Sequence, residues 1–428
     1  MQSLVKLIKK TYAMAQPHES RVVLDNVAAL SVLQVITYLL PVILVPYLFR
    51  MLGPEKFGLI AFAQAFVQYF IIVTDYGFNI CATKEIALCR DEPAAIGKIF
   101  SSVMIIKLAL AFLSLLILAS IVYCVPRFRN DATVYMLSAV AIAGNALFPV
   151  WFFQGMEKMK HITSLNIFGG IVSALLIFSL VQLPQDYLLV PLINSSVVLL
   201  TGLLGQYIVF QSFRVSFTMQ KYEDIACQLK AGWDVFISLA AITAYTNTRV
   251  FLLGLLTNNT VTGFYSIADK IANACQTFPL DSFTRALFPR LSHIYHRNKI
   301  KAQEIMQRIQ HITTIISLLC LPLIFLAADF IVRIACGGMY RETIIALRLL
   351  LIAVFFVAAN AFRVQFLLVC GKTRLYSQIH VGMALVGLPV LFFSIYYFSY
   401  TGAAVATILI EAGIFVITYI NAKKYIFP

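Results

Sequence analysis

The chain has 428 residues, of which 61% are hydrophobic and only 12% are charged, about half the charged fraction of an ordinary soluble domain. A soluble protein could not bury so much apolar surface, so the composition excludes a soluble globular domain and indicates a polytopic membrane protein. The formal charge of +14 does not indicate a nucleic-acid partner, because the basic residues are spread thinly among apolar runs. Such an excess is typical of membrane proteins whose cytoplasmic loops are rich in Lys and Arg.

The first 21 residues contain three lysines but neither an apolar core nor a small-residue cleavage site. We therefore interpret this stretch as an amphipathic helix on the membrane surface rather than a removable signal peptide. The eight cysteines include no Cys-x-x-Cys pair, and most lie in or beside apolar segments. We expect neither a disulfide framework nor a metal site from them.

Apolar segments long enough to cross a bilayer recur along the whole chain. They predict an all-α integral membrane protein with twelve transmembrane helices in two bundles of six. We expect an N-terminal bundle at 1–212, a cytoplasmic linker at 213–231 and a C-terminal bundle at 232–428. The predicted spans are 22–49, 57–80, 99–123, 132–154, 162–183, 187–212, 232–257, 261–284, 309–331, 343–370, 375–398 and 401–422.

The distribution of Lys and Arg predicts the orientation. If the chain starts in the cytoplasm, 22 basic residues lie in cytoplasmic segments, 7 lie in extracytoplasmic segments, and four lie within spans. Because cytoplasmic loops carry the excess of basic residues, we expect both termini in the cytoplasm. The segment around Arg127 is then extracytoplasmic and the segment around Arg297 is cytoplasmic.

The second span, 57–80, carries a polar stripe. Gln64, Gln68 and Asp75 are spaced i, i+4 and i+11, which places them on one face of a helix whose other positions are mostly apolar. A polar stripe within the bilayer is costly unless it faces protein or water. We therefore expect this helix to line an internal cavity.

The eighth span repeats the second at an offset of 205 residues. An even number of spans per repeat gives both halves the same orientation, which is the parallel arrangement of two bundles that flank a central cleft. The repeat predicts that the polar stripe of the eighth span lines the same cavity. The aligned pairs are Gly58 with Gly263, Gln64 with Asp269 and Gln68 with Asn273, and the second stripe continues to Gln276.

Four basic residues lie within predicted spans, namely Lys107, Arg249, Lys270 and Arg363. Each costs at least about 2.5–3.5 kcal/mol at the middle of the bilayer, so each needs water, a partner or a ligand. An internal ion pair or extension to the headgroups is favoured for Lys107, near the end of its span. A wet cavity is the better interpretation for Lys270 and Arg249, and we expect Tyr245, one turn before Arg249, to line it as well. For Arg363 an internal partner and a wet cavity are equally consistent with the sequence. All four are candidate ligands for an anionic substrate.

Glu411 is a carboxyl group midway along the last span, with no basic residue within four positions. An ionised carboxylate cannot persist there alone, so it is either paired or neutral for part of a transport cycle. Glu411, and after it Asp269, are therefore candidates for coupling transport to an ion, and an interhelical hydrogen bond or salt bridge is the alternative. Asp269 could also neutralise Lys270, although adjacent helical residues point about 100° apart.

Several stretches carry a family resemblance. LFRMLGPEKFGLIAFAQAF, followed by DYGF and ATKEIA, and then WFFQGMEKMK at 151–160, resemble the Wzx-type O-antigen flippases. These form the polysaccharide-transporter branch of the superfamily that also contains the MATE drug exporters, and the spacing of the segments extends the resemblance to the whole chain. The resemblance implies translocation of an undecaprenyl-diphosphate-linked O-antigen repeat unit from the cytoplasmic to the periplasmic leaflet of the bacterial inner membrane.

The same resemblance implies the partners: the lipid-linked oligosaccharide, membrane lipids, a proton or sodium ion, and other O-antigen assembly proteins, with no cofactor. Two rival functions agree less well with the sequence. A MATE-like cation or drug antiporter would need a cleft dominated by carboxylates, whereas four in-span cations favour an anionic cargo. A membrane glycan polymerase or ligase would carry a large periplasmic loop, but the predicted extracytoplasmic connections are short and no nucleophile–base arrangement is evident. We therefore predict no enzymatic activity.

Overall fold

The computed structural model describes residues 17–370 and 372–426, and their side chains except at 17–39, 238, 242, 244–246, 277–293, 296–297, 368, 373 and 422–426. The predicted amphipathic stretch therefore lies largely outside the described residues. The described chain is helical, without strands. Its elements are α2 (Pro17–Asp75), α3 (Cys81–Leu88), α4 (Pro93–Cys124), α5 (Pro126–Arg129), α6 (Ala132–Leu147), α7 (Val150–Gly155), α8 (Met159–Leu180), the 3-10 helix η1 (Pro184–Leu188), α9 (Leu189–Ser212), α10 (Tyr222–Leu256), α11 (Asn259–Arg297), α12 (Lys299–Leu326), α13 (Ala328–Cys336), α14 (Arg341–Val369) and α15 (Thr373–Ile426).

Eight helices of the described chain are long and apolar enough to cross a membrane. The predicted all-α membrane fold is therefore confirmed, but the count of twelve separate spans is not reproduced. Two of the eight lie on α2 and α15, and each of these helices carries two predicted spans joined at a sharp break. The segments predicted at 232–257 and 261–284 fall on α10 and α11, outside the eight. The predicted linker at 213–231 is also partly helical, because α10 begins at Tyr222.

The break in α2 shows how the sequence reverses the chain within one apolar run. Gly53 adopts φ 73° and ψ 169°, a conformation that costs glycine little because it has no Cβ. Pro54 follows, and its fixed φ suits the first position of a new helix. The corresponding break in α15 lies at Ser399, with φ 55° and ψ −133°.

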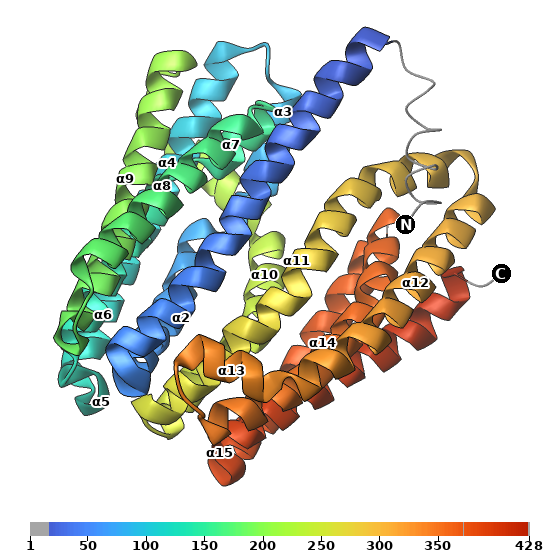
Figure 1. Cartoon of the computed structure of the whole chain (residues 1–428). Coiled ribbons are helices and arrows are strands. Elements are labelled where there is room, and N and C mark those ends of the chain that lie inside the picture. Colours follow the sequence, from blue (N-terminus) through green and yellow to red (C-terminus); the bar gives the residue numbers. More distant parts are fainter. Residues whose placement is uncertain (1–16, 371, 427–428) are drawn as a thin grey trace.

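The molecule consists of two groups of helices with α2 and α11 between them (Figure 1). One apolar core joins α12, α14 and α15 in the C-terminal half, through residues such as Met306 and Phe366. Two further cores lie in the N-terminal half, around Phe66 and around Trp151. A fourth core connects the halves and includes Phe49. Each half therefore has its own core, and the shared core covers only part of the junction.

Two glycines let the repeated helices cross closely. A Cβ added to Gly58 would clash with the Asn259 carbonyl of α11, and a Cβ added to Gly263 would clash with the Pro54 carbonyl of α2. Asn259 follows Pro54 by the same 205 residues that separate the glycines. The contact is therefore reciprocal, as a two-fold relation between two repeats requires.

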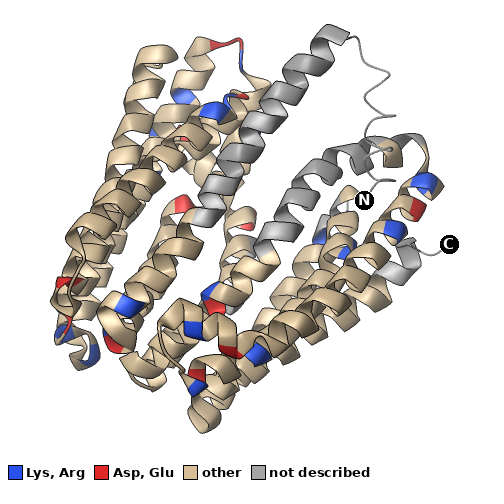
Figure 2. Cartoon of the chain, in the orientation of Figure 1, with Lys and Arg blue, Asp and Glu red and all other residues tan. Residues whose placement is uncertain are grey.

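The end of the molecule that contains Gly53 is tied together across the two halves. Arg127 on α5 donates hydrogen bonds to the carbonyl oxygens of Gly254 at 2.7 Å and Thr257 at 3.4 Å. Arg50 donates from Nε to the Ala335 carbonyl at 3.1 Å. These basic residues belong to the sparsely charged side of the predicted topology, and we call this the Gly53 end. Elsewhere, charged residues also gather mainly near helix ends (Figure 2).

Candidate functional site

A polar cavity of about 540 Å³ lies between the halves. Its walls come from the second half of α2 and from α10, α11, α14 and α15. Most of the polar residues predicted from the sequence to share a cavity meet here. They are Gln64, Gln68, Arg249, Asp269, Lys270, Asn273, Gln276 and Glu411.

The polar stripes of α2 and α11 face this cavity because both helices keep one polar face at helical spacing. Gln64 and Gln68 are one turn apart on α2, as are Asp269 and Asn273 on α11. Asn273 donates from Nδ2 to Asp269 Oδ2 at 3.0 Å. The close crossing at Gly58 brings the two stripes onto facing walls of the same cavity.

Arg249 and Asp269 form an ion pair that links α10 to α11. Arg249 Nη2 lies 3.2 Å from Asp269 Oδ1, and the two side chains are only 17% and 14% exposed. Asp269 therefore pairs with a residue of another helix rather than with Lys270, its neighbour in sequence. The cause is geometric, because successive side chains of a helix point about 100° apart.

Lys270 lines the cavity with an exposed side chain and has no hydrogen bond or ion pair within the described part of the protein. It also lines a second, mainly apolar space of about 1040 Å³ bounded by the first half of α2, α11 and α13. Asn273 lines both spaces as well. Pro46, Ile271 and Ile334 are among the residues of the apolar wall. We call this second space the apolar groove, and Lys270 stands where the groove meets the polar cavity.

Glu411 enters the cavity from α15 and likewise has no hydrogen bond or ion pair among the described residues. With Glu411 ionised, its charge and that of Asp269 balance the charges of Arg249 and Lys270. With Glu411 protonated, the cavity carries one excess positive charge. Thr407, one turn before Glu411, lines the same wall. Sequence reasoning missed Thr407, although its helical spacing from Glu411 could have indicated it.

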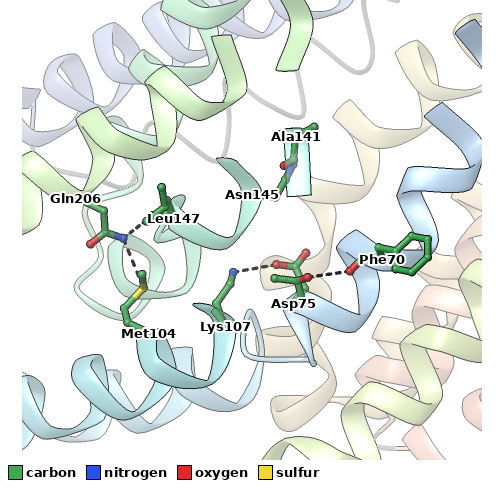
Figure 3. A network of polar contacts seen from close by, with 9 residues as sticks. Phe70, Asp75, Met104, Lys107, Ala141, Asn145, Leu147 and Gln206 are labelled. Carbon is green, nitrogen blue, oxygen red and sulfur yellow. Dashed lines mark hydrogen bonds and ion pairs between the residues drawn. The ribbon is translucent and has the colours of Figure 1, made fainter. Parts of the chain in front are cut away.

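Three other predicted residues lie elsewhere. Lys107 is 1% exposed, does not reach the cavity, and pairs with Asp75 at 2.9 Å between Nζ and Oδ1 (Figure 3). Asp75 does not line the cavity either, because its carboxylate faces Lys107. Arg363 packs over the rings of Phe415 and Tyr419, 5.1 Å from each centroid. Burial of a cation against an internal partner explains why these positions tolerate charge. The side chain of Tyr245, predicted to line the cavity, lies outside the described residues.

The described helices form two halves around a polar cavity, which is the architecture of a multi-pass membrane protein with a polar space between two bundles. The structure resembles the inward-facing conformation of a multidrug resistance MATE family transporter of the MOP superfamily, with a TM-score of 0.71, 14% identity, and coverage of 90% of this chain and 95% of that chain. It also resembles the Lipid II flippase MurJ in an inward closed conformation, with a TM-score of 0.69, 11% identity, and coverage of 92% and 87%. These likenesses concern the fold.

Sequence comparison assigns the chain to a narrower class of proteins than the fold does. Residues 23–295 match the family described as "Polysaccharide biosynthesis protein", and the chain belongs to that family. A relative from Escherichia coli (strain K12), named "Putative O-antigen transporter", is 31% identical over 395 residues, which cover 90% of this chain and 93% of that protein. The family expected from the sequence motifs is thus confirmed.

Proposed function

We propose that this protein is a flippase that moves undecaprenyl-diphosphate-linked O-antigen repeat units from the cytoplasmic to the periplasmic leaflet of a bacterial inner membrane. The name of the Escherichia coli relative supports an O-antigen cargo. The membrane-spanning helices and the cavity between two repeated halves support alternating access. The proposal assigns both termini to the cytoplasm, from the 22-to-7 distribution of basic residues.

The observation that carries this proposal is the position of Lys270 at the junction of the polar cavity and the apolar groove. A lipid diphosphate has its negative charge between a sugar head and a hydrocarbon tail. An ammonium group at the junction offers charge-assisted hydrogen bonds to phosphate oxygens while the tail stays in apolar surroundings. A soluble anion would gain nothing from the groove, whereas a lipid-linked one uses both spaces.

The charge balance of the cavity suggests how transport is coupled. When Glu411 is ionised, the charges of the described acidic and basic residues in the cavity cancel. A bound diphosphate therefore adds negative charge that no cavity residue compensates. Protonation of Glu411 offsets part of that charge and leaves Lys270 for the phosphate. Release of the cargo and of the proton then restores the balanced cavity. We propose coupling to protons through Glu411, with sodium as the alternative coupling ion and Asp269 as the next candidate residue.

The contacts at the Gly53 end suggest which state the structure represents. Arg127 and Arg50 tie the halves together there, and the shared apolar core lies around them. Under the proposed topology this is the periplasmic end, so the structure is closed to the periplasm. Outward opening then requires these contacts to separate while the Arg249–Asp269 pair stays within the C-terminal half.

The first test is transport in proteoliposomes that contain a fluorescent undecaprenyl-diphosphate oligosaccharide. Wild-type protein should expose the lipid-linked sugar to the outer leaflet, and Lys270→Ala should slow this at least tenfold without loss of folded protein. Lys301→Ala removes a lysine that is exposed at the start of α12 and should behave as wild type. Wild-type rates with Lys270→Ala would remove the central role of this lysine, and absence of flipping by the wild type would contradict the proposed function.

A MATE-like cation antiporter is the second candidate, because Asp269 and Glu411 place two carboxyl groups in the cavity. A cationic cargo would compete with Arg249 for Asp269 and would be repelled by Lys270. The two candidates separate by binding: a lipid diphosphate should bind more weakly after Lys270→Ala, whereas an organic cation should bind more tightly.

A further inference from the structure

The N-terminal half contains a second cavity, of about 460 Å³, lined by α2, α6, α8 and α9, whose mainly apolar wall carries a group of polar side chains. This volume lies in the range of about 300–1,000 Å³ typical of small-molecule sites. Gln64 and Gln68 line this cavity and the central one, so the two spaces share a wall. We call it the amide cavity, because amide side chains dominate its polar lining.

The chemistry of the amide cavity differs from that of the central cavity. The described residues that line it include no Lys, Arg, His, Asp or Glu. Asn145, Asn166 and Asn194 line it together with the two shared glutamines, and serine and threonine hydroxyls complete the polar groups. Such a lining has both donors and acceptors but no net charge.

Hydrogen bonds between helices account for Asn194 but not for Asn145, Asn166 or Gln64. Polar side chains within a membrane bundle are usually satisfied by hydrogen bonds between helices, as Ser173 and Asn194 are at 2.7 Å. Asn145 instead bonds through Nδ2 to the Ala141 carbonyl of its own helix at 2.9 Å (Figure 3). Gln64 and Asn166 have no hydrogen-bond partner within the described chain, and both side chains are exposed where they line the cavity. These groups remain available to a ligand.

A neutral sugar fits this lining better than other parts of the cargo. Sugar hydroxyls both donate and accept hydrogen bonds, and a side-chain amide can meet one hydroxyl as donor and another as acceptor. A phosphate group would require cations, which the described residues place in the central cavity and not in this one. A hydrocarbon chain would leave the amides without partners, which is costly away from water.

We propose that the amide cavity is the glycan subsite of the transporter, and this proposal rests on the proposed function. The diphosphate lies at Lys270, the lipid tail lies in the apolar groove, and the sugars next to the diphosphate reach past Gln64 and Gln68 into the N-terminal half. The central cavity thus recognises what all lipid-linked cargoes share. The amide cavity recognises the sugar, and it contributes the specificity for the repeat unit.

The test is a comparison of two ligands on the full-length protein in lipid nanodiscs. Undecaprenyl diphosphate and the same lipid carrying one N-acetylglucosamine are titrated separately, and the ratio of their dissociation constants measures the sugar contribution. The wild type should bind the glycosylated lipid about tenfold more tightly. Asn166→Leu and Asn145→Leu should each reduce that advantage by about threefold or more, while the affinity for the bare lipid changes less than twofold. Lys270→Ala should instead weaken both ligands equally.

Asn421→Leu is the matched control, because Asn421 lies on α15 outside both cavities and bonds only to its own helix. It should bind both ligands as the wild type does, and thermal unfolding of every variant checks its folding. Equal binding of the two lipids by the wild type, with dependence on Lys270 retained, would overturn the glycan subsite and leave the flippase proposal standing. Equal weakening of both ligands by Asn166→Leu would also overturn the subsite. Failure of the wild type to bind either lipid would overturn both proposals.

Discussion

The two halves turn different chemistry toward the same space although they are built on one repeat. On α2, the facing positions are the neutral Gln64 and Gln68; on α11, the equivalent positions are Asp269 and Asn273, with Lys270 alongside. The glycines that set the crossing are the same in both repeats. The repeat therefore preserves the geometry of the crossing, whereas the charge of each wall is free to change.

The in-span lysines of the two halves show the same contrast. Lys107 of the N-terminal half is buried and paired with Asp75, so its charge is neutralised inside the protein. Lys270 of the C-terminal half lines the cavity without such a pair among the described residues. A charge within the bilayer does not by itself indicate a substrate site, because an internal partner can satisfy it. A charged side chain indicates a substrate site when it also lines a cavity and has no partner within the protein.

Disrupting the close crossing of α2 and α11 should have the largest effect, and that effect should be on stability. Gly263→Leu places a side chain against the Pro54 backbone, and neither helix can yield without separating the two halves. We expect destabilisation beyond the about 1–3 kcal/mol typical of overpacking, seen as loss of a monodisperse species in size-exclusion chromatography and a lower thermal midpoint. Gly382→Ala is the control, because a Cβ there meets nothing within 4 Å. Normal stability of Gly263→Leu would show that the close crossing is not required.

Breaking the Lys107–Asp75 ion pair in the N-terminal half should have the second-largest effect. Asp75→Asn leaves Lys107 without a carboxylate partner at 1% exposure. We expect a loss near the lower end of the about 3–5 kcal/mol range for broken buried pairs, because Asp75 is itself 32% exposed. Adding Lys107→Met should restore much of the stability measured by thermal unfolding, with transport retained. Loss of transport in a stable double variant would instead assign a transport role to Lys107.

Making the two walls alike sharpens the comparison. Gln64→Asp gives α2 the residue that α11 carries at the equivalent position, and it adds a carboxylate facing the proposed phosphate site. We expect undecaprenyl diphosphate to bind about tenfold more weakly, because one additional like charge at this range costs on the order of 1.4 kcal/mol. Gln64→Asn keeps the wall neutral and should change this affinity less than threefold. Unchanged binding by Gln64→Asp would place the phosphate away from α2.

Removing the titratable group of the C-terminal wall should have the smallest effect on binding and should act on the pH profile. Glu411→Gln fixes the neutral form of this side chain, so we expect slower turnover and a flatter dependence of transport on pH, measured in proteoliposomes between pH 5 and pH 8. Glu411→Asp should be partly active. Wild-type turnover with an unchanged pH profile in Glu411→Gln would make Glu411 a structural residue, and Asp269 would be the next group to test.

The sequence alone determined the fold class and much of the central cavity. Apolar segments of spanning length dictate helices in a membrane, because backbone groups in lipid can be satisfied only within the helix or a closed sheet. Helical spacing then places Gln64 with Gln68, and the offset of 205 residues places Asp269 and Asn273 opposite them. These inferences hold because they depend on local periodicity and on the repetition of one crossing.

Only the tertiary structure decided the partner of each charge. Arg249 pairs with Asp269 across two helices, Lys107 pairs with Asp75, and Arg363 lies over aromatic rings, while Lys270 remains at the junction of two spaces. Periodicity gives the face of a helix on which a side chain lies, but it does not give the rotation of that helix against its neighbours. The free energy of a buried charge depends on the groups within a few ångströms of it, and those groups come from helices far apart in the sequence.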